Sequence, residues 1–169
     1  MTELSSEEIH QIKGSECIVQ LNLPPLKPKL KHDARLGLLI YDPLRQKFVA
    51  LTPEEWVRQN FTAFMQRSLG YPSGLMANEI GIKLNGMTRR CDTVVFNRQA
   101  SPLMIVEYKA PGVRITGDVF NQIVRYNMVL KAEYLVVSNG LQHYCCHVDY
   151  STLTTRFLPQ IPFYKDIQP

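Results

Sequence analysis

The sequence predicts an α/β domain in which a mixed central β-sheet is flanked by helices. Two apolar runs of strand length, 91–96 and 103–109, lie on either side of a polar loop and indicate a β-hairpin. A strong helix start at Thr52 precedes this hairpin, and a second helical segment extends from Thr116 to about residue 130 after it. We expect the first helix on one face of the sheet and the second helix nearby.

The composition is that of an ordinary globular domain. Of 169 residues, 45% are hydrophobic and 20% are charged, so a single ordered domain is expected. The net charge of +4 is compatible with a polyanionic partner but does not require one. Four cysteines without paired spacing argue against a disulfide framework, and no leader or membrane-length apolar stretch is evident. We therefore expect a cytoplasmic protein with reduced thiols and no membrane partner.

We expect three segments along the chain. Residues 1–35 form an N-terminal arm, residues 36–150 form the domain, and residues 151–169 form an extension packed on it. The arm contains a proline-rich, basic strap at 22–31, which predicts an extended segment lying over the surface. Its role is open: the strap either contacts a partner or, as we favour, packs and tethers.

The first helix has a well-marked beginning. Thr52 is the expected N-cap, Pro53 the first helical residue and Glu55 the reciprocal partner of Thr52 in a capping box. Leu51 and Trp56 occupy the positions of a hydrophobic staple. The inward stripe of this helix comprises Trp56, Val57, Phe61, Phe64 and Met65.

The strand predicted at 79–84 brings another carboxylate toward the central hairpin. The Asn-Gly pair at 85–86 is a strong signal for a type I′ turn. Pairing about that turn places Glu79 beside Asp92. Glu79 then either adds a third carboxylate to a site there or pairs with a basic side chain such as Arg90, and the second interpretation is the simpler one. The remaining strands are expected at 36–40, 47–51, 133–138 and 142–148.

The central hairpin brings charged residues together. Folded about its midpoint, it pairs Phe96 with Leu103, Val94 with Ile105 and Asp92 with Glu107. Facing carboxylates lie about 5 Å apart at Cβ and repel one another, so they require a cation. Lys109 points to the same side as Glu107 because side chains alternate along a strand. One end of the hairpin therefore carries Asp92, Glu107 and Lys109 around one point.

Asp92, fourteen intervening residues and then Glu107-Tyr108-Lys109 resemble the PD-(D/E)xK nuclease motif. Gln122 and Tyr126 follow as Gln-x-x-x-Tyr, which resembles the additional motif in the nuclease domain of the type I restriction endonuclease R subunit. Segments 52–59 and 137–144 resemble that family's flanking segments, and the resemblance covers roughly residues 40–148. Cys91 stands where the motif's name has Pro. The resemblance implies a restriction-endonuclease-like core.

Oxygen ligands suit a hard cation, so Mg²⁺, with Mn²⁺ as a substitute, is the expected cofactor of Asp92 and Glu107. The resemblance implies that the carbonyl of Tyr108 is a further ligand and that Lys109 orients or activates the attacking water. It also implies that Gln122 and Tyr126 steady the site or contact the DNA backbone. The expected catalytic residues are Asp92, Glu107, Lys109, Gln122 and Tyr126.

Two other acidic residues are further metal-ligand candidates. Related nucleases often place a helical glutamate beside the metal, and on the helical wheel Glu54 lies at the edge of the inward stripe whereas Glu55 turns away. Both glutamates also suit the helix N-terminus without any metal role. Glu79 is the second candidate.

Two other motifs do not support a site. His143, Cys145 and His147 share one strand face, but a second ligand pair with zinc spacing is missing, so buried strand residues are expected. A Walker A loop is excluded because Asp118 and Val119 stand where Lys and Ser or Thr are required. We therefore expect no ATP motor within this chain.

The residues and the resemblance support two hypotheses. The first is a Mg²⁺-dependent DNA endonuclease, related to type I restriction enzyme R subunits but without the ATPase motor. The alternative is a catalytically silent nucleic-acid-binding or assembly module of the same fold. DNA is the expected partner, together with a separate regulatory or motor protein.

Overall fold

Helix α2 (Pro53–Ser68) begins where the sequence predicts, in a computed structural model that describes residues 12–167. The side chain of Thr52 accepts a hydrogen bond from the backbone N–H of Glu55 at 3.1 Å, and Pro53 is the first helical residue. The reciprocal half of the predicted capping box is wrong. The carboxylate of Glu55 turns inward, where it accepts from arginine side chains.

A six-stranded sheet forms the centre of the fold. Its strands are β4 (Met76–Leu84), β5 (Met87–Phe96), β6 (Pro102–Tyr108), β7 (Tyr134–Ser138), β8 (His143–Asp149) and β9 (Thr154–Leu158), in that spatial order. Only β6 and β7 are parallel among its neighbouring pairs, so the sheet is mixed, as the sequence predicts. Helix α3 (Gly117–Leu130) makes the crossover that a parallel pair needs.

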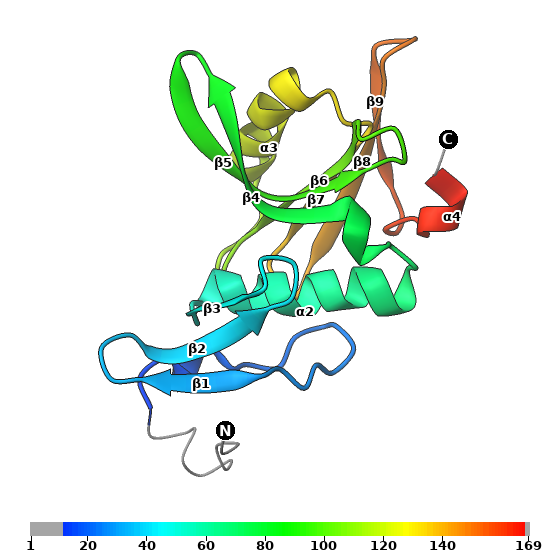
Figure 1. Ribbon diagram of the computed structural model, residues 1–169. Coiled ribbons are helices and arrows are strands. Elements are labelled where there is room, and N and C mark those ends of the chain that lie inside the picture. The colour runs from blue at the N-terminus through cyan, green and yellow to red at the C-terminus, as the bar shows by residue number, and fades with distance from the viewer. Residues whose placement is uncertain (1–11, 168–169) are drawn as a thin grey trace.

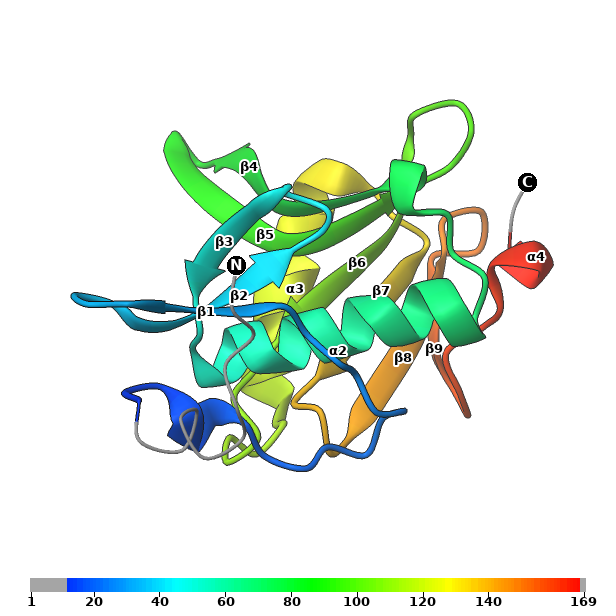
Figure 2. The ribbon, with the colours of Figure 1, turned by 60° about the horizontal axis from the view of Figure 1, so that its bottom comes forward.

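The two helices cover opposite faces of this sheet. Figure 1 shows the sheet with α2 below it and α3 above it, and Figure 2 looks onto the face that α2 crosses. Alternate strand residues supply the two cores because side chains alternate between faces. Under α2 lie Val95, Met104, Val106, Val136 and Cys145. Under α3 lie Val94, Ile105, Leu135, Val137 and Cys146.

A smaller sheet covers the other side of α2. Its strands β1 (Leu30–Asp33), β2 (Gly37–Asp42) and β3 (Lys47–Ala50) are antiparallel. The β2–β3 hairpin is confirmed. Strand β1 was not expected, since the proline-rich strap ends in a strand that pairs with β2 instead of remaining unpaired. The small sheet buries Leu38, Ile40, Leu51 and Trp56 in a third core, which includes both hydrophobic-staple positions.

The strand registers agree with the sequence except at both ends of the central hairpin and at Glu79. The ladder stops at Thr93 and Val106, one residue short of the predicted pair of Asp92 and Glu107, and Glu79 is skipped in the pairing of β4 with β5. Val94 pairs with Ile105, as predicted, but Phe96 faces Pro102 rather than Leu103. A bulge between Val95 and Phe96 shifts the register there, because an extra residue on one strand displaces the pairing beyond it. The β4–β5 hairpin turns at the Asn-Gly pair, as expected.

The remaining elements are short. Short 3₁₀ helices lie at η1 (Ser15–Cys17) and η2 (Ser73–Leu75), and α4 (Tyr164–Ile167) follows β9. The sequence did not predict β9, whose residues are mostly exposed. Thr116 precedes α3, but its side chain does not cap the helix. None of the helices in the described part of the chain has the length and hydropathy needed to span a membrane.

Candidate active site

The candidate site is built where the β4–β5 pairing is interrupted. Asn78 pairs with Thr93 and Ile80 with Cys91, and between these pairs Glu79 has a left-handed backbone with φ 59°. Such a backbone conformation is unusual for a residue other than Gly, Asn or Asp. The interruption lies directly opposite Asp92, whose side chain meets groups from α2 and β6. Strain of this kind is often found at functional sites.

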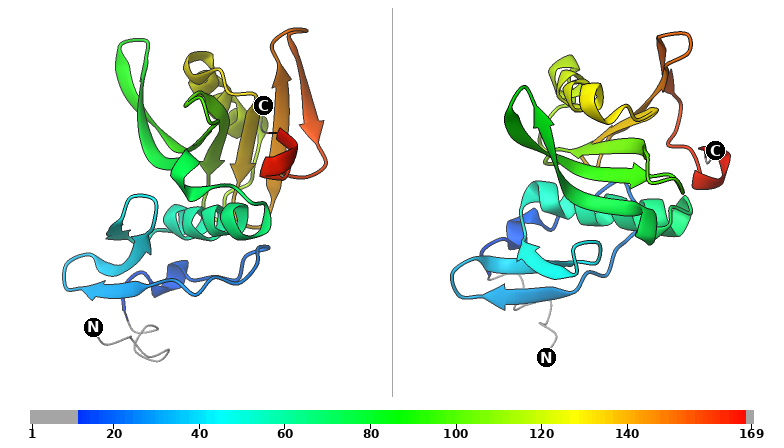
Figure 3. Two further views of the ribbon diagram at one scale, coloured as in Figure 1. Left: turned by 45° about the vertical axis from the view of Figure 1, so that its right-hand side comes forward. Right: turned by 45° about the horizontal axis from the view of Figure 1, so that its top comes forward.

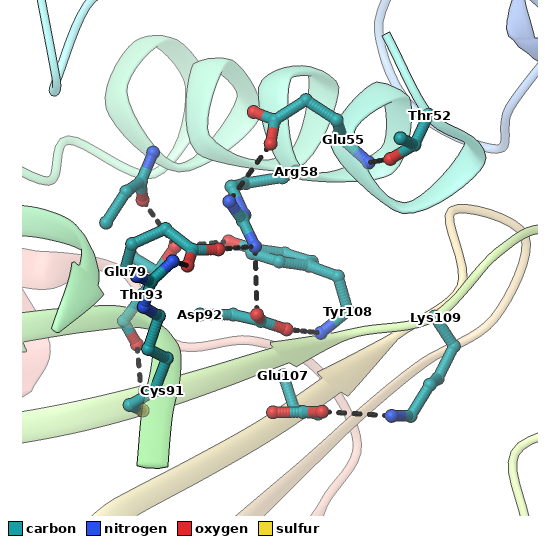
Figure 4. Close-up of polar contacts among 12 residues, drawn as sticks. Thr52, Glu55, Arg58, Glu79, Cys91, Asp92, Thr93, Glu107, Tyr108 and Lys109 are labelled. Carbon is teal, nitrogen blue, oxygen red and sulfur yellow. Dashed lines mark hydrogen bonds and ion pairs between the residues drawn. The ribbon is translucent and has the colours of Figure 1, made fainter. Parts of the chain in front are cut away.

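Asp92 is held by two donors. Its Oδ2 accepts from the backbone N–H of Tyr108 at 2.8 Å, and its Oδ1 accepts from Nη2 of Arg58 at 2.9 Å. The first bond ties β5 to the end of β6, where Glu107 and Lys109 lie on either side of Tyr108. Figure 4 shows Asp92 above Glu107, with the backbone of Tyr108 beside both.

Glu107 lies under α3, where a small polar cluster surrounds it. Its side chain is 4% exposed, and its Oε1 accepts from Nζ of Lys109 at 3.0 Å and from Nε2 of Gln122 at 2.6 Å. Gln122 also accepts from Lys109 at 3.0 Å and donates to the hydroxyl of Tyr126 at 3.1 Å. The structure thus brings Lys109, Gln122 and Tyr126 to Glu107, with Asp92 close to the same carboxylate.

The two carboxylates influence each other's protonation. Burial raises the pKa of Glu107, and repulsion from Asp92 raises it further, to about 7, against the opposing effect of Lys109. Burial also raises the pKa of Asp92, although Arg58 and the N–H of Tyr108 favour its charged form. The pair therefore holds negative charge in a buried place at an energetic cost.

Arg58, which the sequence analysis did not identify, is the cation that meets Asp92. Its guanidinium contacts Glu79 at 2.6 Å and Glu55 at 3.0 Å as well as Asp92, and only 6% of its side chain is exposed. Burial disfavours its charge, yet the three carboxylates outweigh this effect and raise its pKa. The one signal in the sequence was its spacing of three residues from Glu55, which puts both on one helix face.

A second buried network runs from the small sheet to β6. Arg45 pairs with Asp42 and with Glu55. The amide of Asn78 donates to Asp42 at 2.8 Å and accepts from the hydroxyl of Thr93 at 2.6 Å. The hydroxyl of Tyr108 donates to Thr93 at 3.1 Å. These bonds fix the backbone on which Asp92 and Glu107 stand.

The helical wheel predicted the orientations of the two glutamates of α2 the wrong way round. Glu54 is exposed, and Glu55 is 7% exposed and joins the Arg58 network, so the expectation that Glu54 faces the site is wrong. Glu79 does reach the site's edge. It pairs there with Arg58 and, at 3.4 Å, with Arg90, so the predicted ion pair with Arg90 is present, and a role of Glu79 as a metal ligand stays a prediction.

The donor set and the local charge fit a hard divalent cation. Five carboxylates in this region meet only three buried or half-buried cations, with exposed Arg90 at the rim. The carboxylates are those of Asp42, Glu55, Glu79, Asp92 and Glu107. Within residues 12–167, no cluster of three or more His, Cys, Asp or Glu side chains could hold a metal ion. A cation bound by two carboxylates would therefore keep several water ligands, as Mg²⁺ commonly does.

The histidines and cysteines of β8 serve packing. Nδ1 of His143 bonds the hydroxyl of Ser138 at 2.8 Å, and its ring packs against Phe61. Cys145 and Cys146 are buried in the two different cores, on opposite faces as predicted. In the described chain these residues form no zinc site.

Comparison with known proteins places the chain in a family. The profile of the family described as "Type I restriction enzyme R protein N terminus (HSDR_N)" matches residues 53–162. A comparison with curated proteins finds no match.

Among solved structures, the fold is similar to a fragment of a putative HsdR subunit of a type I restriction enzyme from Vibrio vulnificus YJ016. The TM-score is 0.52 and the sequence identity is 17%, over 68% of this chain and 24% of that chain. The likeness supports the restriction-endonuclease-like fold. The present chain spans about a quarter of the length of that structure.

Proposed function

The chain belongs to the family formed by the N-terminal region of type I restriction enzyme R proteins, and on this premise we propose that it is a Mg²⁺-dependent DNA endonuclease domain. The observation that carries the proposal is the convergence of Asp92, Glu107 and Lys109 at one end of the β5–β6 hairpin. Nζ of Lys109 lies 3.0 Å from Oε1 of Glu107, and the backbone N–H of Tyr108, the residue between them, donates to Asp92.

Each residue has a distinct task in the proposed reaction. Asp92 and Glu107, with the carbonyl of Tyr108, would hold Mg²⁺, and Mn²⁺ is expected to substitute for it. When bound, the ion would polarise the scissile phosphate and lower the pKa of an attacking water. Nζ of Lys109 would orient that water and stabilise the negative charge that develops on the phosphate.

The surrounding residues would keep these groups in position. Gln122 bonds both Glu107 and Lys109, so it holds the carboxylate and the ammonium at a fixed separation. The hydroxyl of Tyr126 accepts from the same amide. Arg58 would hold Asp92 ionised and oriented, because two donors fix both of its oxygens.

One observation favours a second candidate, a binding or assembly module without turnover. Arg58 is already paired with Asp92, and Lys109 is already paired with Glu107. If these contacts persist, a cation gains less on binding. The family also suggests DNA and other subunits as partners, and a separate motor protein would then control or use this domain.

A cleavage assay on supercoiled, linear and single-stranded DNA with Mg²⁺ or Mn²⁺ tests the first candidate. We expect Asp92→Ala, Glu107→Ala and Lys109→Ala each to abolish cleavage, and Gln122→Ala to slow it by about tenfold, equivalent to about 1.4 kcal/mol. The exposed Glu54→Ala variant is the matched control and should cleave like the parent. Cleavage by all three alanine variants at the parental rate rejects the site. A folded parent that binds DNA but never cleaves it supports the second candidate.

A further inference from the structure

A polar cleft of 540 Å³ lies between the β4–β5 hairpin and α3. Arg89 and Met87 line it from the hairpin, and Asn121, Gln122 and Arg125 line it from the helix. In Figure 3 the hairpin projects beyond the body of the sheet, beside α3. The cleft therefore has a wall on each side, and its lining side chains are mainly polar.

The cleft leads directly to the candidate active site. Gln122 and Tyr126 line the cleft, and the same Gln122 amide bonds Glu107 and Lys109. Both Gln122 and Tyr126 are half-buried, with one part of each in the cluster around Glu107. A ligand in the cleft would thus touch the residues that position Glu107 and Lys109.

The charges at the cleft suit an anionic strand. Arg89 and Arg125 are exposed and flank it from opposite walls, and Asp118 is the one acidic residue in its lining. Within residues 12–167, neither arginine has a carboxylate within ion-pair distance, whereas Arg58 and Arg45 in the interior are each paired with carboxylates. A guanidinium binds phosphate with two parallel N–H bonds and is well suited to such a place.

We propose that this cleft binds the sugar–phosphate backbone of one DNA strand, with Arg89 and Arg125 as phosphate contacts on its two walls. The strand would enter between the hairpin and α3 and pass Gln122 on the way to Asp92 and Glu107. The inference rests on the proposed function for the identity of the ligand. It adds the path and the contacts, which depend on the hairpin and α3 rather than on the carboxylates.

Binding without turnover tests this inference separately from catalysis. Fluorescence anisotropy with a labelled DNA duplex, in Ca²⁺ and in EDTA, measures affinity for the parent, Arg89→Ala, Arg125→Ala and the double variant. Each single change should weaken binding by about 3- to 10-fold and reduce the slope of log K against log salt by about one. The double variant should lose affinity by about the product of the two single losses.

The matched control is Arg98→Ala, which removes the same charge from the exposed β5–β6 loop at the other end of β5. It should change affinity less than twofold. A labelled single strand in the same assay shows whether the protein binds a single strand or a duplex more tightly. We expect the affinity for the more tightly bound form to depend on Arg89 and Arg125. Arg125→Ala changes an exposed helical position, so it remains informative if changes in the hairpin reduce stability.

Two outcomes overturn the inference: a parent that binds neither DNA form, or arginine variants that bind as the parent or the Arg98→Ala control does. Arginine-dependent binding by a parent that never cleaves retains the inference and rejects only the nuclease. If the parent cleaves DNA but its affinity does not depend on either arginine, the nuclease is retained and the inference about the cleft is rejected.

Discussion

At the scale of single residues, Glu107 combines the features of a functional carboxylate. It is buried, it lies close to Asp92, and its partners Lys109 and Gln122 come from the strand end and from α3. Most buried carboxylates are paired so that their charge is satisfied. Here one ammonium and one amide do not offset burial and the nearby charge of Asp92, so the pKa of Glu107 rises to about 7.

A pH dependence of stability follows from Glu107. Between its ordinary pKa of 4.5 and the raised value of about 7, the folded protein retains a proton that the unfolded chain releases. Stability from this group is therefore full below about pH 4.5 and is lost as the pH rises to about 7, by at most about 3 kcal/mol. Glu107→Gln, which mimics the protonated acid and keeps Oε1, should unfold like the parent at pH 4.5 and be more stable at pH 8.

Urea unfolding at pH 4.5, 6 and 8 measures this effect. The exposed Glu54→Gln variant is the control, and its difference from the parent should not vary with pH. If the stability of the Glu107→Gln protein follows that of the parent at every pH, Glu107 is not protonated near neutrality and the repulsion from Asp92 is weak.

At the scale of elements, the beginning of α2 is joined to the sheet by charge as well as by packing. Arg58 links α2 to the β4 carboxylate Glu79 and the β5 carboxylate Asp92, while Glu55 links α2 to Arg45 near β3. Buried ion pairs cost desolvation free energy, so they are a poor device for stability alone. Here they set the orientation of α2 relative to strands β4 and β5, because Arg58 contacts Glu79 and Asp92 together.

Removing Arg58 should therefore cost much more than an ordinary surface change. Arg58→Ala leaves three carboxylates without their shared cation, and we expect a loss of about 3–5 kcal/mol in the free energy of unfolding. Arg58→Lys should recover part of it, since one ammonium replaces a forked guanidinium. Arg67→Ala, on the exposed last turn of the same helix, should change stability by no more than about 0.5 kcal/mol.

Thermal and urea unfolding of these three variants decides the matter. Equal stabilities for Arg58→Ala and Arg67→Ala would show that the network contributes nothing to the attachment of α2. A large loss that Arg58→Lys does not recover at all would assign the effect to side-chain packing rather than to charge.

At the scale of the whole molecule, the distribution of charge is uneven. The chain carries a net +4, yet its centre concentrates five carboxylates on three buried or half-buried cations. The positive charge therefore lies elsewhere, on exposed side chains such as Arg89 and Arg125. A basic exterior around an acidic centre is compatible with the polyanionic substrate and the metal ion of the proposed function.

This arrangement predicts that a divalent cation stabilises the fold. For an ion with Kd of about 1 mM, 10 mM Mg²⁺ should add about 1.4 kcal/mol, which corresponds to a rise in Tm of about 3–5 °C. The shift should be larger at pH 8 than at pH 6, because the proton on Glu107 competes with the ion. Asp92→Asn should remove it, and an equal ionic strength of NaCl is the control. A rise in Tm that survives Asp92→Asn would place the ion elsewhere.

The sequence by itself determined the features that short-range chemistry encodes. The Thr52 cap, the Asn-Gly hairpin and the pairing of Val94 with Ile105 all follow from local rules of turns and periodicity. That register in turn placed Asp92 near Glu107, and strand alternation placed Lys109 beside it. The acidic residues and the lysine could therefore be brought together from the sequence alone.

Only the tertiary structure decided how this site is supported. Arg58 meets Asp92 from 34 residues away, and no spacing rule connects a helix to a strand across that separation. The helical wheel misplaced Glu54 and Glu55 because it assumes one buried face, whereas α2 packs between two sheets that also bury the polar Arg58, Gln59 and Asn60. Strand β1 and the interruption at Glu79 depend likewise on neighbouring strands. Partner choice between distant elements is set by how they pack, which local sequence patterns do not specify.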